Sequence, residues 1–471
     1  MQTHNKSLLN LIRFLSLIIN ISLEDQIIKL KVNQPGEIFI INNTKIPNPD
    51  EIYINSELNF TNTSIITIEN IAHEIELRFT NKLTTCENMF STLSHIKEID
   101  LTNFDSSECT NMDFMFNDCI FLEKIQFGNF NTGQVTSMCN MFANCSSLVD
   151  LDISGFNSSK VTNINLMFYA CEKLRYLDLS NFNSSSVTTA YGLFMDCFNL
   201  ENINLTGFKT NNIKNFCLMF NNCSSLKSLD LSSFDTYFAD CIGYMFYGCS
   251  SLTSLNLSNF YSMYAFWIMD YMFGQCINLE YINLYNIHDK GGQLTFSNKG
   301  FLEGTPENLV MCYQLSNARG INTKFNEKKC TVFDCGEDWK KYQKKINAST
   351  GECMISCNEG GNNLYEYNNK CYNQCPQGTK ENIANFTCED IIIEKTEYIN
   401  DINQENTIKI TNVETAFDST NNILRSDIDT ANNDSNITSK IISTSLNTDI
   451  YIYIIVILFL SLEMNVNSIK H

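Results

Sequence analysis

The stretch MFNNCSSL at residues 219–226 decides the fold, because its Met-Phe-x-x-Cys pattern recurs along the chain. The step between copies is 26 residues, except for a last step of 27, and a leucine replaces methionine in one copy. A fixed period of this length is typical of a solenoid, in which one unit cannot bury its apolar face without its neighbours. The copies begin at Met115, Met141, Met167, Leu193, Met219, Met245 and Met272.

A leucine-rich stretch follows the cysteine of these units and predicts a short strand. It has the form Leu-x-x-Leu-x-Leu-x-x-Phe, as in Leu174, Leu177, Leu179 and Phe182. The alternation of Leu177 and Leu179 with polar residues is the period-two signature of a strand. We expect the leucines to point inward.

The other half of each unit predicts a short helix. Its apolar residues are separated by steps of three, three, one and three, which places one stripe along about two to three helical turns. Thr136 and Thr162 stand where N-caps would lie. The expected fold class is therefore α/β: a leucine-rich repeat solenoid with parallel strands on the concave face and short helices on the convex face, followed by a small C-terminal disulfide-rich module. The stripe in one unit consists of Val135, Met138, Met141, Phe142 and Cys145.

Two details of the repeat point to a known family. Phenylalanine follows the strand in place of the more usual Asn or Cys, and the turn has the sequence Met-Phe-x-x-Cys-Ser-Ser-Leu. Over residues 70–313 the chain resembles the BspA-like leucine-rich repeat surface proteins. The resemblance implies a cell-surface protein for adhesion or recognition, and it carries over no catalytic residues.

The ends of a solenoid need covers, because a terminal unit exposes an apolar core and an unpaired strand edge. Residues 24–70 contain alternating apolar stretches and predict a β-rich N-terminal cap. The solenoid is expected over residues 71–313, with Ile75 and Leu77 in a degenerate first repeat. Residues 309–312 predict a final irregular strand.

Residues 314–388, together with the cysteine just before them, predict a disulfide-rich module. Eight cysteines in fewer than eighty residues suit a small disulfide framework in an oxidising compartment. Zinc is less favoured, because structural zinc sites usually space paired ligands as Cys-x-x-Cys and these pairs are Cys-x-x-x-Cys. The connectivity stays open. The candidates are Cys312, Cys330, Cys335, Cys353, Cys357, Cys371, Cys375 and Cys388.

The cysteines inside the solenoid fall into two groups. Those of the Met-Phe-x-x-Cys pattern are expected to be small buried hydrophobic residues. The others break the repeat and are better disulfide candidates. Cys217 and Cys241 lie one unit apart, so a bridge between them is compatible with stacked units. The cysteines outside the pattern are Cys86, Cys109, Cys139, Cys217 and Cys241.

The N-terminus and the Asn-x-Ser/Thr triplets favour an extracellular location. Residues 1–23 carry two basic residues before an apolar run and predict a secretory signal peptide. The triplets are acceptors for N-linked glycans in that compartment, although a chain rich in asparagine and serine also forms them by chance. The candidate glycosylation sites are Asn59, Asn144, Asn157, Asn183, Asn222, Asn347, Asn385 and Asn436.

The C-terminal region predicts a stalk and an attachment to the membrane. Residues 389–449 are acidic, rich in Asn, Ser and Thr, and lack cysteine, glycine and proline, which suits an extended stalk. Residues 450–471 predict a hydrophobic anchor signal or a short membrane segment. Their uncharged run, 450–462, is shorter than the about 20 residues that a spanning helix needs, and it suits the apolar tail of a glycolipid-anchor signal. The charged tail that follows leaves glycolipid anchoring, a short span and secretion all open.

Charge and motifs exclude several classes of function. The net charge of −20 and the pI near 4.7 disfavour binding to nucleic acid or to an anionic membrane surface. The five histidines are scattered, and the chain contains no phosphate loop, metalloprotease motif or nucleophile elbow. We therefore expect a protein that is not an enzyme and uses no cofactor and no metal.

The expected binding surface is the strand face, where two columns of side chains point outward. Adjacent strands lie about 4.8 Å apart, so the columns form a polar surface with Tyr176 and Tyr281 as aromatic anchors. The alternative is that these residues are merely solvated and kept by repeat duplication. Calcium is less favoured, because flat sheets rarely enclose a cation. The candidate ligand-binding residues are Asp150, Asp152, Tyr176, Asp178, Asn202, Asn204, Asp230, Asn256, Tyr281 and Asn283.

Two interpretations of function follow. The first is an adhesion or recognition protein that binds an extracellular protein or glycan through its concave sheet. The second is a glycosylated surface-coat protein without a specific ligand. Asn204 and Asn256 begin glycan-acceptor triplets inside the proposed binding column, so occupied glycans there would favour the second interpretation.

Overall fold

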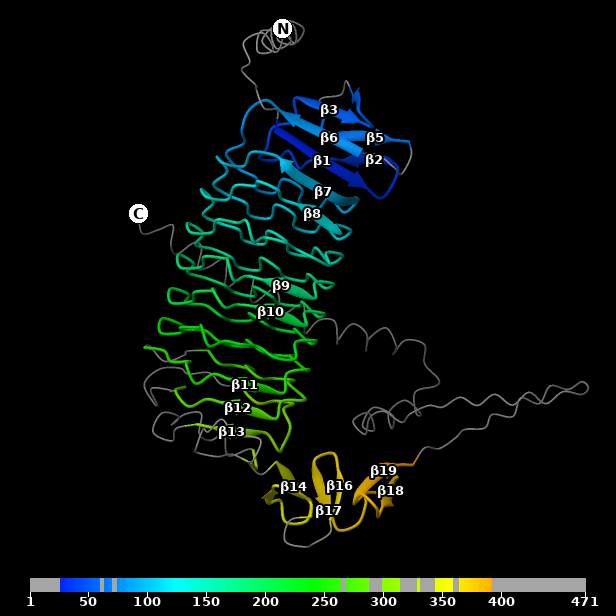
Figure 1. Cartoon of the computed structure of the whole chain (residues 1–471), viewed down its shortest axis with the longest axis vertical. Helices are drawn as coiled ribbons and strands as arrows, with labels where there is room; N and C mark the ends of the chain where they lie inside the picture. Colours follow the sequence, from blue (N-terminus) through cyan, green and yellow to red (C-terminus); the bar gives the residue numbers. More distant parts are fainter. Residues whose placement is uncertain are drawn as a thin grey trace, which may run out of the picture. The chain divides into compact units, whose positions relative to one another are not determined.

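The computed structural model describes residues 26–59, 63–69, 74–263, 268–287, 299–313, 328–330, 344–358 and 364–391. These residues form strands and turns, and none of them lies in a helix (Figure 1). The chain divides into a unit of residues 1–389 and a unit of residues 390–471. Of the second unit, only residues 390 and 391 are described.

The N-terminal region is a cap of antiparallel strands that continues directly into the solenoid. β1 (Gln26–Val32) pairs antiparallel with β6 (Glu74–Phe79) and with β7 (Ile96–Asn103). β7 in turn pairs parallel with β8 (Lys124–Gln126), so one sheet covers the strand edge of the first coil. The remaining cap strands are β2 (Gly36–Phe39), β3 (Glu51–Ile54), β4 (Glu57–Asn59) and β5 (Ile65–Ile68).

The cap sheet also defines where the repeats begin. β6 contains Ile75 and Leu77, which are buried in this sheet beyond residue 70. These two residues therefore belong to the cap, and β7 provides the first strand of the solenoid.

The solenoid stacks short strands in parallel, as the leucine pattern predicts, although the coils of Leu151 and Leu229 contain no strand. β9 and β10 pair in parallel with Leu177 opposite Ile203, and β11 and β12 pair with Leu255 opposite Ile282. All four side chains are buried, so the inward position of the leucines is confirmed. The strands are β9 (Tyr176–Asp178), β10 (Asn202–Asn204), β11 (Ser254–Asn256), β12 (Tyr281–Asn283) and β13 (Val310–Cys312).

The prediction of short helices on the convex face is wrong, because the chain forms consecutive turns there. Leu166 and Ala170 have φ values of 54° and 53°, in the left-handed region that interrupts an α-helix. Between such residues the N–H of Met167 donates to the carbonyl of Ile164, three residues back, at 3.2 Å. The next N–H, that of Phe168, leaves the coil and donates to Leu193 of the following coil at 3.0 Å. Turns within a coil and bonds between coils therefore alternate.

The left-handed positions recur in pairs four residues apart along the described solenoid, which has about nine coils. Eight of these positions are asparagine or glycine, the residues that tolerate this conformation best. The pairs are 88/92, 114/118, 140/144, 166/170, 192/196, 218/222, 244/248, 271/275 and 300/304, and the eight are Asn88, Asn140, Asn144, Gly192, Asn222, Gly248, Gly300 and Gly304.

Thr136 and Thr162 were expected to cap helices. Instead, they link successive coils. The backbone N–H of Thr136 donates to the carbonyl of Thr110 at 2.9 Å, and its hydroxyl donates to the same carbonyl at 3.2 Å. Thr162 repeats both bonds to the carbonyl of Thr136. A threonine ladder thus runs along this side of the solenoid.

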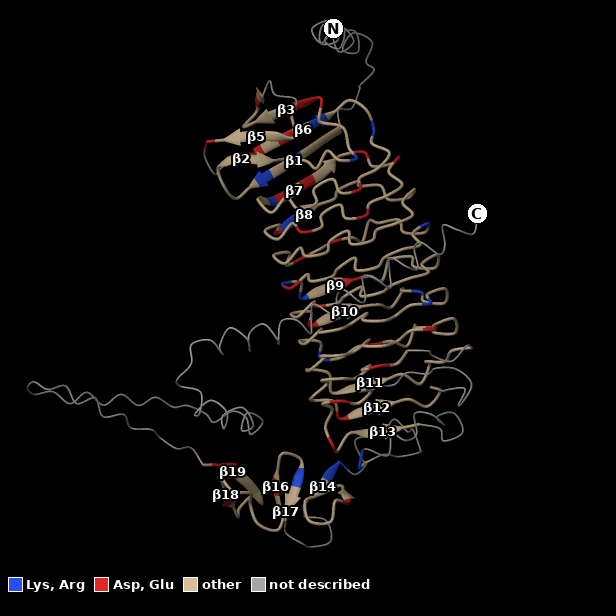
Figure 2. Ribbon diagram, turned by 180° about the vertical axis from the view of Figure 1, so that it is seen from behind, with Lys and Arg blue, Asp and Glu red and all other residues tan. Residues whose placement is uncertain are grey.

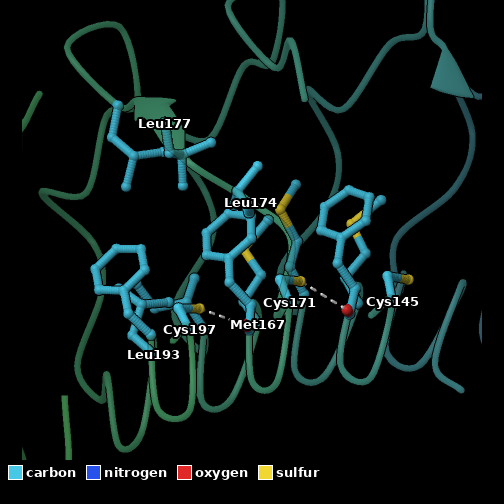
Figure 3. Close-up of a cluster of buried hydrophobic side chains, with 14 of the residues drawn as sticks. Cys145, Met167, Cys171, Leu174, Leu177, Leu193 and Cys197 are labelled. Carbon is cyan, nitrogen blue, oxygen red and sulfur yellow. Dashed lines mark hydrogen bonds between the residues drawn. The ribbon is translucent and has the colours of Figure 1, made fainter. Parts of the chain in front are cut away.

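The cysteines of the repeat are packed inside the coils (Figure 3). Cys145, Cys171 and Cys197 lie in one row, and each S–H donates to a phenylalanine carbonyl in the coil before it at 3.1–3.2 Å. Burial raises the pKa of the Cys171 thiol to about 12. The prediction that these cysteines act as buried hydrophobic residues is confirmed. The phenylalanines stack face to face with centroids 5.3–5.8 Å apart, in the series Phe90, Phe116, Phe142, Phe168, Phe194, Phe220, Phe246 and Phe273.

The cysteine-rich region is a small sheet held by disulfides, as its composition predicts. Cys330 bonds to Cys353, Cys357 to Cys371 and Cys375 to Cys388. Cys312 is also disulfide-bonded, and Cys335 lies outside the described residues. The strands are β14 (Lys345–Asn347), β15 (Cys353–Met354), β16 (Tyr365–Tyr367), β17 (Lys370–Tyr372), β18 (Thr379–Asn382) and β19 (Thr387–Asp390).

Candidate functional site

The aspartates that directly follow Leu151, Leu177 and Leu229 serve the local backbone. Asp178 is the last residue of β9, and its carboxylate accepts a hydrogen bond from the N–H of Ser180 at 2.8 Å. Asp152 and Asp230 accept the same bond from the residue two places on, each at 2.9 Å. This Asx turn ends β9 at Asp178, and in all three coils it starts the next turn. One oxygen of each carboxylate is therefore engaged.

These bonds also fix the charge of the three carboxylates. The N–H and hydroxyl of Ser180 lower the pKa of Asp178. The hydroxyl and N–H of Ser154 do the same for Asp152, and Ser232 does so for Asp230. The strand face therefore keeps its negative charge at neutral pH.

The asparagines of the same column make the same turn. Asn204 accepts a bond from the N–H of Thr206 at 3.2 Å and another from its hydroxyl at 2.7 Å. Asn256 accepts a bond from the N–H of Ser258 at 3.1 Å. An aspartate or an asparagine at this position thus serves the geometry of the turn, a role that requires no ligand.

The neighbouring column carries the exposed aromatic ring of the strand face. Tyr176 is 50 % exposed, and Asp150 and Asn202 on the coils either side of it are exposed. The hydroxyl of Tyr176 donates to the second carboxylate oxygen of Asp178 at 3.4 Å. Pairing of β9 with β10 sets Tyr176 beside Asn202 and Asp178 beside Asn204. The sequence-predicted residues in the middle coils therefore do lie together.

The prediction that Tyr281 and Asn283 bind a ligand on the open strand face is wrong, because both side chains are buried. They are 5 % and 9 % exposed. Tyr281 belongs to an apolar cluster with Val310, Cys312, Cys330 and Ile346. Two of these residues come from the cysteine-rich region, which covers the strand face at this end of the solenoid.

Ion pairs also join the cysteine-rich region to the last coils. Lys370 pairs with Glu307 at 3.0 Å, and Lys344 pairs with Glu280 at 3.8 Å. Figure 2 shows few charged residues along the coils and more of them on the cap strands. The open part of the strand face therefore lies between the cap and Tyr281.

The glycan-acceptor asparagines in the coils are of two kinds. Asn157 and Asn183 are exposed, and each accepts a bond from the hydroxyl of the serine that completes its triplet, at 2.8 and 2.7 Å. Asn144 and Asn222 are partly buried and donate their amide N–H to Asp118 and Asp196 of the preceding coil.

The other predicted acceptors lie outside the solenoid coils. Asn385 is exposed, and Asn347 accepts a bond from the hydroxyl of Ser349 at 2.7 Å. Asn59 ends β4, and Asn436 lies outside the described residues. The expected signal peptide, stalk and anchor segment also lie outside them, apart from residues 389–391.

The sequence analysis did not predict an exposed cluster of three aromatic side chains. Tyr237, Phe238 and Tyr261 are 38 %, 40 % and 46 % exposed. The rings of Tyr237 and Phe238 meet edge to face at 5.0 Å, and Tyr237 stacks on Tyr261 at 6.0 Å. The signal in the sequence is a departure from the repeat, because Ser185 and Asn211 occupy the position of Tyr237 in the two preceding coils.

A column of buried hydroxyl groups was also missed. Ser106 accepts the N–H of Asn131 and donates to its carbonyl, both at 2.8 Å. The signal is a serine or threonine two places after the phenylalanine that follows each strand. Among the described residues Ser158 is the member whose buried hydroxyl has no hydrogen-bond partner. The column contains Ser106, Thr132, Ser158, Ser184, Thr210, Thr236 and Ser262.

A cavity of about 250 Å³ lies between the cap and the first coil. Its lining includes Lys45, Asp50 and Lys82. Lys45 pairs with Glu87, and Lys82 pairs with Asp105 at 2.5 Å. Because carboxylates of the protein already neutralise both lysines, the cavity offers no free positive charge to an anion.

No three His, Cys, Asp or Glu side chains that the structure describes converge as a metal site. No helix within the described ranges has the length and apolar character needed to cross a membrane.

The comparison with known families agrees with the repeat. Residues 84–202 and 171–286 each match the family described as Mycoplasma protein of unknown function, DUF285. The two overlapping matches together span the coils between the cap and the last strands, so the chain is similar to this family over its solenoid. No curated protein matches the chain.

Proposed function

We propose that this chain is a BspA-like leucine-rich repeat protein of the cell surface, which binds a protein or glycan ligand through its strand face. The observation that supports the proposal is the half-exposed ring of Tyr176 between the exposed polar residues Asp150 and Asn202. Aromatic side chains flanked by polar groups are common energetic centres of binding surfaces.

The geometry of the strand face suits recognition. Asp152 and Asp178 are fixed by their Asx turns, so they offer preordered negative charge at little further entropic cost. Tyr176 supplies apolar area with few rotatable bonds. A ligand with hydroxyl or amide donors and one apolar face, such as a sugar ring or an extended peptide segment, fits this combination.

The extracellular location is part of the proposal. Disulfides in the solenoid and in the cysteine-rich region persist in oxidising compartments. Signal peptide 1–23 and anchor 450–471 remain predictions from the sequence. They would place the solenoid outside the cell, attached to its surface.

The test is a screen of the purified protein against glycan and protein arrays. Tyr176→Ser removes the exposed ring of the strand face. The matched control is Phe198→Ser, which removes a ring that is 39 % exposed elsewhere on the coils. Saturable binding that Tyr176→Ser abolishes and Phe198→Ser retains supports the proposal. Binding that both variants retain contradicts it.

A surface-coat protein is the second candidate function, and one observation favours it. Asn157 and Asn183 are exposed at the same position of adjacent coils, so two glycans there would cover one edge of the solenoid. Peptide mass spectrometry of the native protein distinguishes the candidates. Full occupancy at Asn204 and Asn256, on the strand face, would favour a shielded coat.

A further inference from the structure

Two thiols of the first coils are close enough to react with each other. The Sγ atoms of Cys86 and Cys109 lie 2.7 Å apart, inside the contact distance of two unbonded sulfur atoms. Both side chains are fully buried. They come from successive coils, since the N–H of Cys86 donates to the carbonyl of Asn111 in the second coil at 3.0 Å.

Both cysteines replace the residue that the repeat uses at their positions. The position of Cys86 is methionine in the next two coils, Met112 and Met138. The position of Cys109 is valine in the next two, Val135 and Val161. These are contacting core positions of successive coils, so the two departures from the repeat occur as a matched pair.

A second pair shows that stacked coils accept such a bond. Cys217 and Cys241 form a disulfide between successive coils with a Cα–Cα distance of 5.4 Å. Disulfides need a Cα–Cα distance of about 4.4–6.8 Å, and parallel strands are stacked about 4.8 Å apart. The spacing between coils thus falls inside the Cα–Cα range that a disulfide needs. Cys86 and Cys109 are 23 residues apart in the sequence, and the bonded cysteines are 24 residues apart.

We propose that Cys86 and Cys109 form a disulfide that joins the first coil of the solenoid to the second. The bond closes by exchange with a disulfide oxidant, either a small-molecule disulfide or the disulfide of a thiol oxidoreductase. One thiolate attacks the oxidant, releases one of its thiols and forms a mixed disulfide. The other thiolate then attacks the protein sulfur and releases the second thiol, so two protons and two electrons leave the protein.

The position of the bond gives it a role. Burial raises the pKa of the Cys86 thiol, so exchange takes place while the first coil is open, during folding. The closed bond then holds the coil that carries β7, which pairs with both the cap and the second coil. Fraying of a solenoid begins at its ends, and the bond opposes it at this end.

The full-length protein tests the proposal after alkylation in denaturant without reductant. Trypsin separates the two cysteines into peptides 83–97 and 98–124, and the second also contains Cys119. We expect mass spectrometry to find these peptides linked through Cys86 and Cys109, with Cys119 alkylated. Alkylated Cys86 and Cys109 in a sample with an intact Cys217–Cys241 bond would overturn the proposal, as would a link to Cys119.

Two variants keep the test independent of folding. Cys86→Met with Cys109→Val restores the residues of the repeat, so we expect the variant to fold without this bond and to keep the Cys217–Cys241 bond. Cys139→Ser is the control, because the Cys139 thiol accepts a bond from the amide of Asn140 instead of meeting another thiol. We expect native-state hydrogen exchange of β7 to quicken in the double variant by at least about tenfold and to stay unchanged in the control. Equal exchange in all three proteins would contradict the proposed role of the bond.

Discussion

The carboxylate of Asp178 accepts a hydrogen bond from the backbone N–H of Ser180 at 2.8 Å. The same bond joins Asp152 to Ser154 and Asp230 to Ser232. The column that the sequence presents as a binding surface is therefore first a set of Asx turns. The ligand contact that we propose falls to the neighbouring column, in which Tyr176 is the exposed aromatic residue.

These Asx turns predict how stability depends on pH. The serine bonds lower the folded-state pKa of Asp152, Asp178 and Asp230. The stability that they contribute is fully present above the unfolded pKa of about 3.9 and is lost as pH falls through the lower folded pKa. We expect thermal melts to show a fall in melting temperature between about pH 4 and pH 2.

The triple variant Asp152→Asn/Asp178→Asn/Asp230→Asn is the control for this effect. Asparagine makes the same turn at Asn204, so the variant should melt near the wild-type temperature at pH 7. Its melting temperature should fall less on acidification. An identical pH profile in both proteins would show that these carboxylates do not carry the effect.

Glycine substitutions test whether turns or helices form the side opposite the strands. Ala170 has a φ of 53°, a conformation that costs a non-glycine residue about 1–2 kcal/mol. Ala170→Gly should therefore leave the free energy of unfolding unchanged or raise it. Ala143→Gly, at a buried position without this conformation, should lower it by about 0.5–1 kcal/mol. In a helix both substitutions would cost about 1 kcal/mol, so equal losses in denaturant titrations would restore the helical interpretation.

The buried hydroxyl column makes a prediction about stability. The Ser158 hydroxyl is buried without a partner, so Ser158→Ala should raise the free energy of unfolding by about 1 kcal/mol. Ser106→Ala breaks two bonds to Asn131 and should lower it by about 1–3 kcal/mol. Urea titrations of the two variants measure both effects. Equal destabilisation would mean that Ser158 also has a partner in solution.

Tyr281 should behave as a core residue. It is 5 % exposed and packs against Val310 and Ile346, so Tyr281→Ala should lower the free energy of unfolding by about 3 kcal/mol. Differential scanning calorimetry of the purified protein measures the loss. A variant as stable as wild type would place Tyr281 on an open surface, where the sequence predicts it.

The sequence predicts the solenoid and its strands because the period and the leucine alternation are direct consequences of stacking. It also predicts the possible bridge between Cys217 and Cys241, because the spacing of one unit places them on adjacent coils. It does not distinguish a helix from consecutive turns, since apolar residues at steps of three occur in both. Asn140, Asn144 and the glycines at equivalent positions carry the missing signal, because they favour positive φ.

The sequence predicts the middle part of the candidate site but not its end at Tyr281. The residues from Asp150 to Asn204 share a face because strand alternation and coil stacking are local properties. Burial of Tyr281 depends on contact with Ile346, more than sixty residues further on. No periodicity contains that contact, so the sequence could not predict it.

The most direct test of the proposed function is the affinity of the first ligand that the arrays identify. A central aromatic contact contributes at least about 2 kcal/mol, which corresponds to about 30-fold in Kd. Isothermal titration should therefore show Kd rising about 30-fold or more in Tyr176→Ser and staying within about twofold of wild type in Phe198→Ser. An unchanged Kd in Tyr176→Ser would contradict recognition through the strand face.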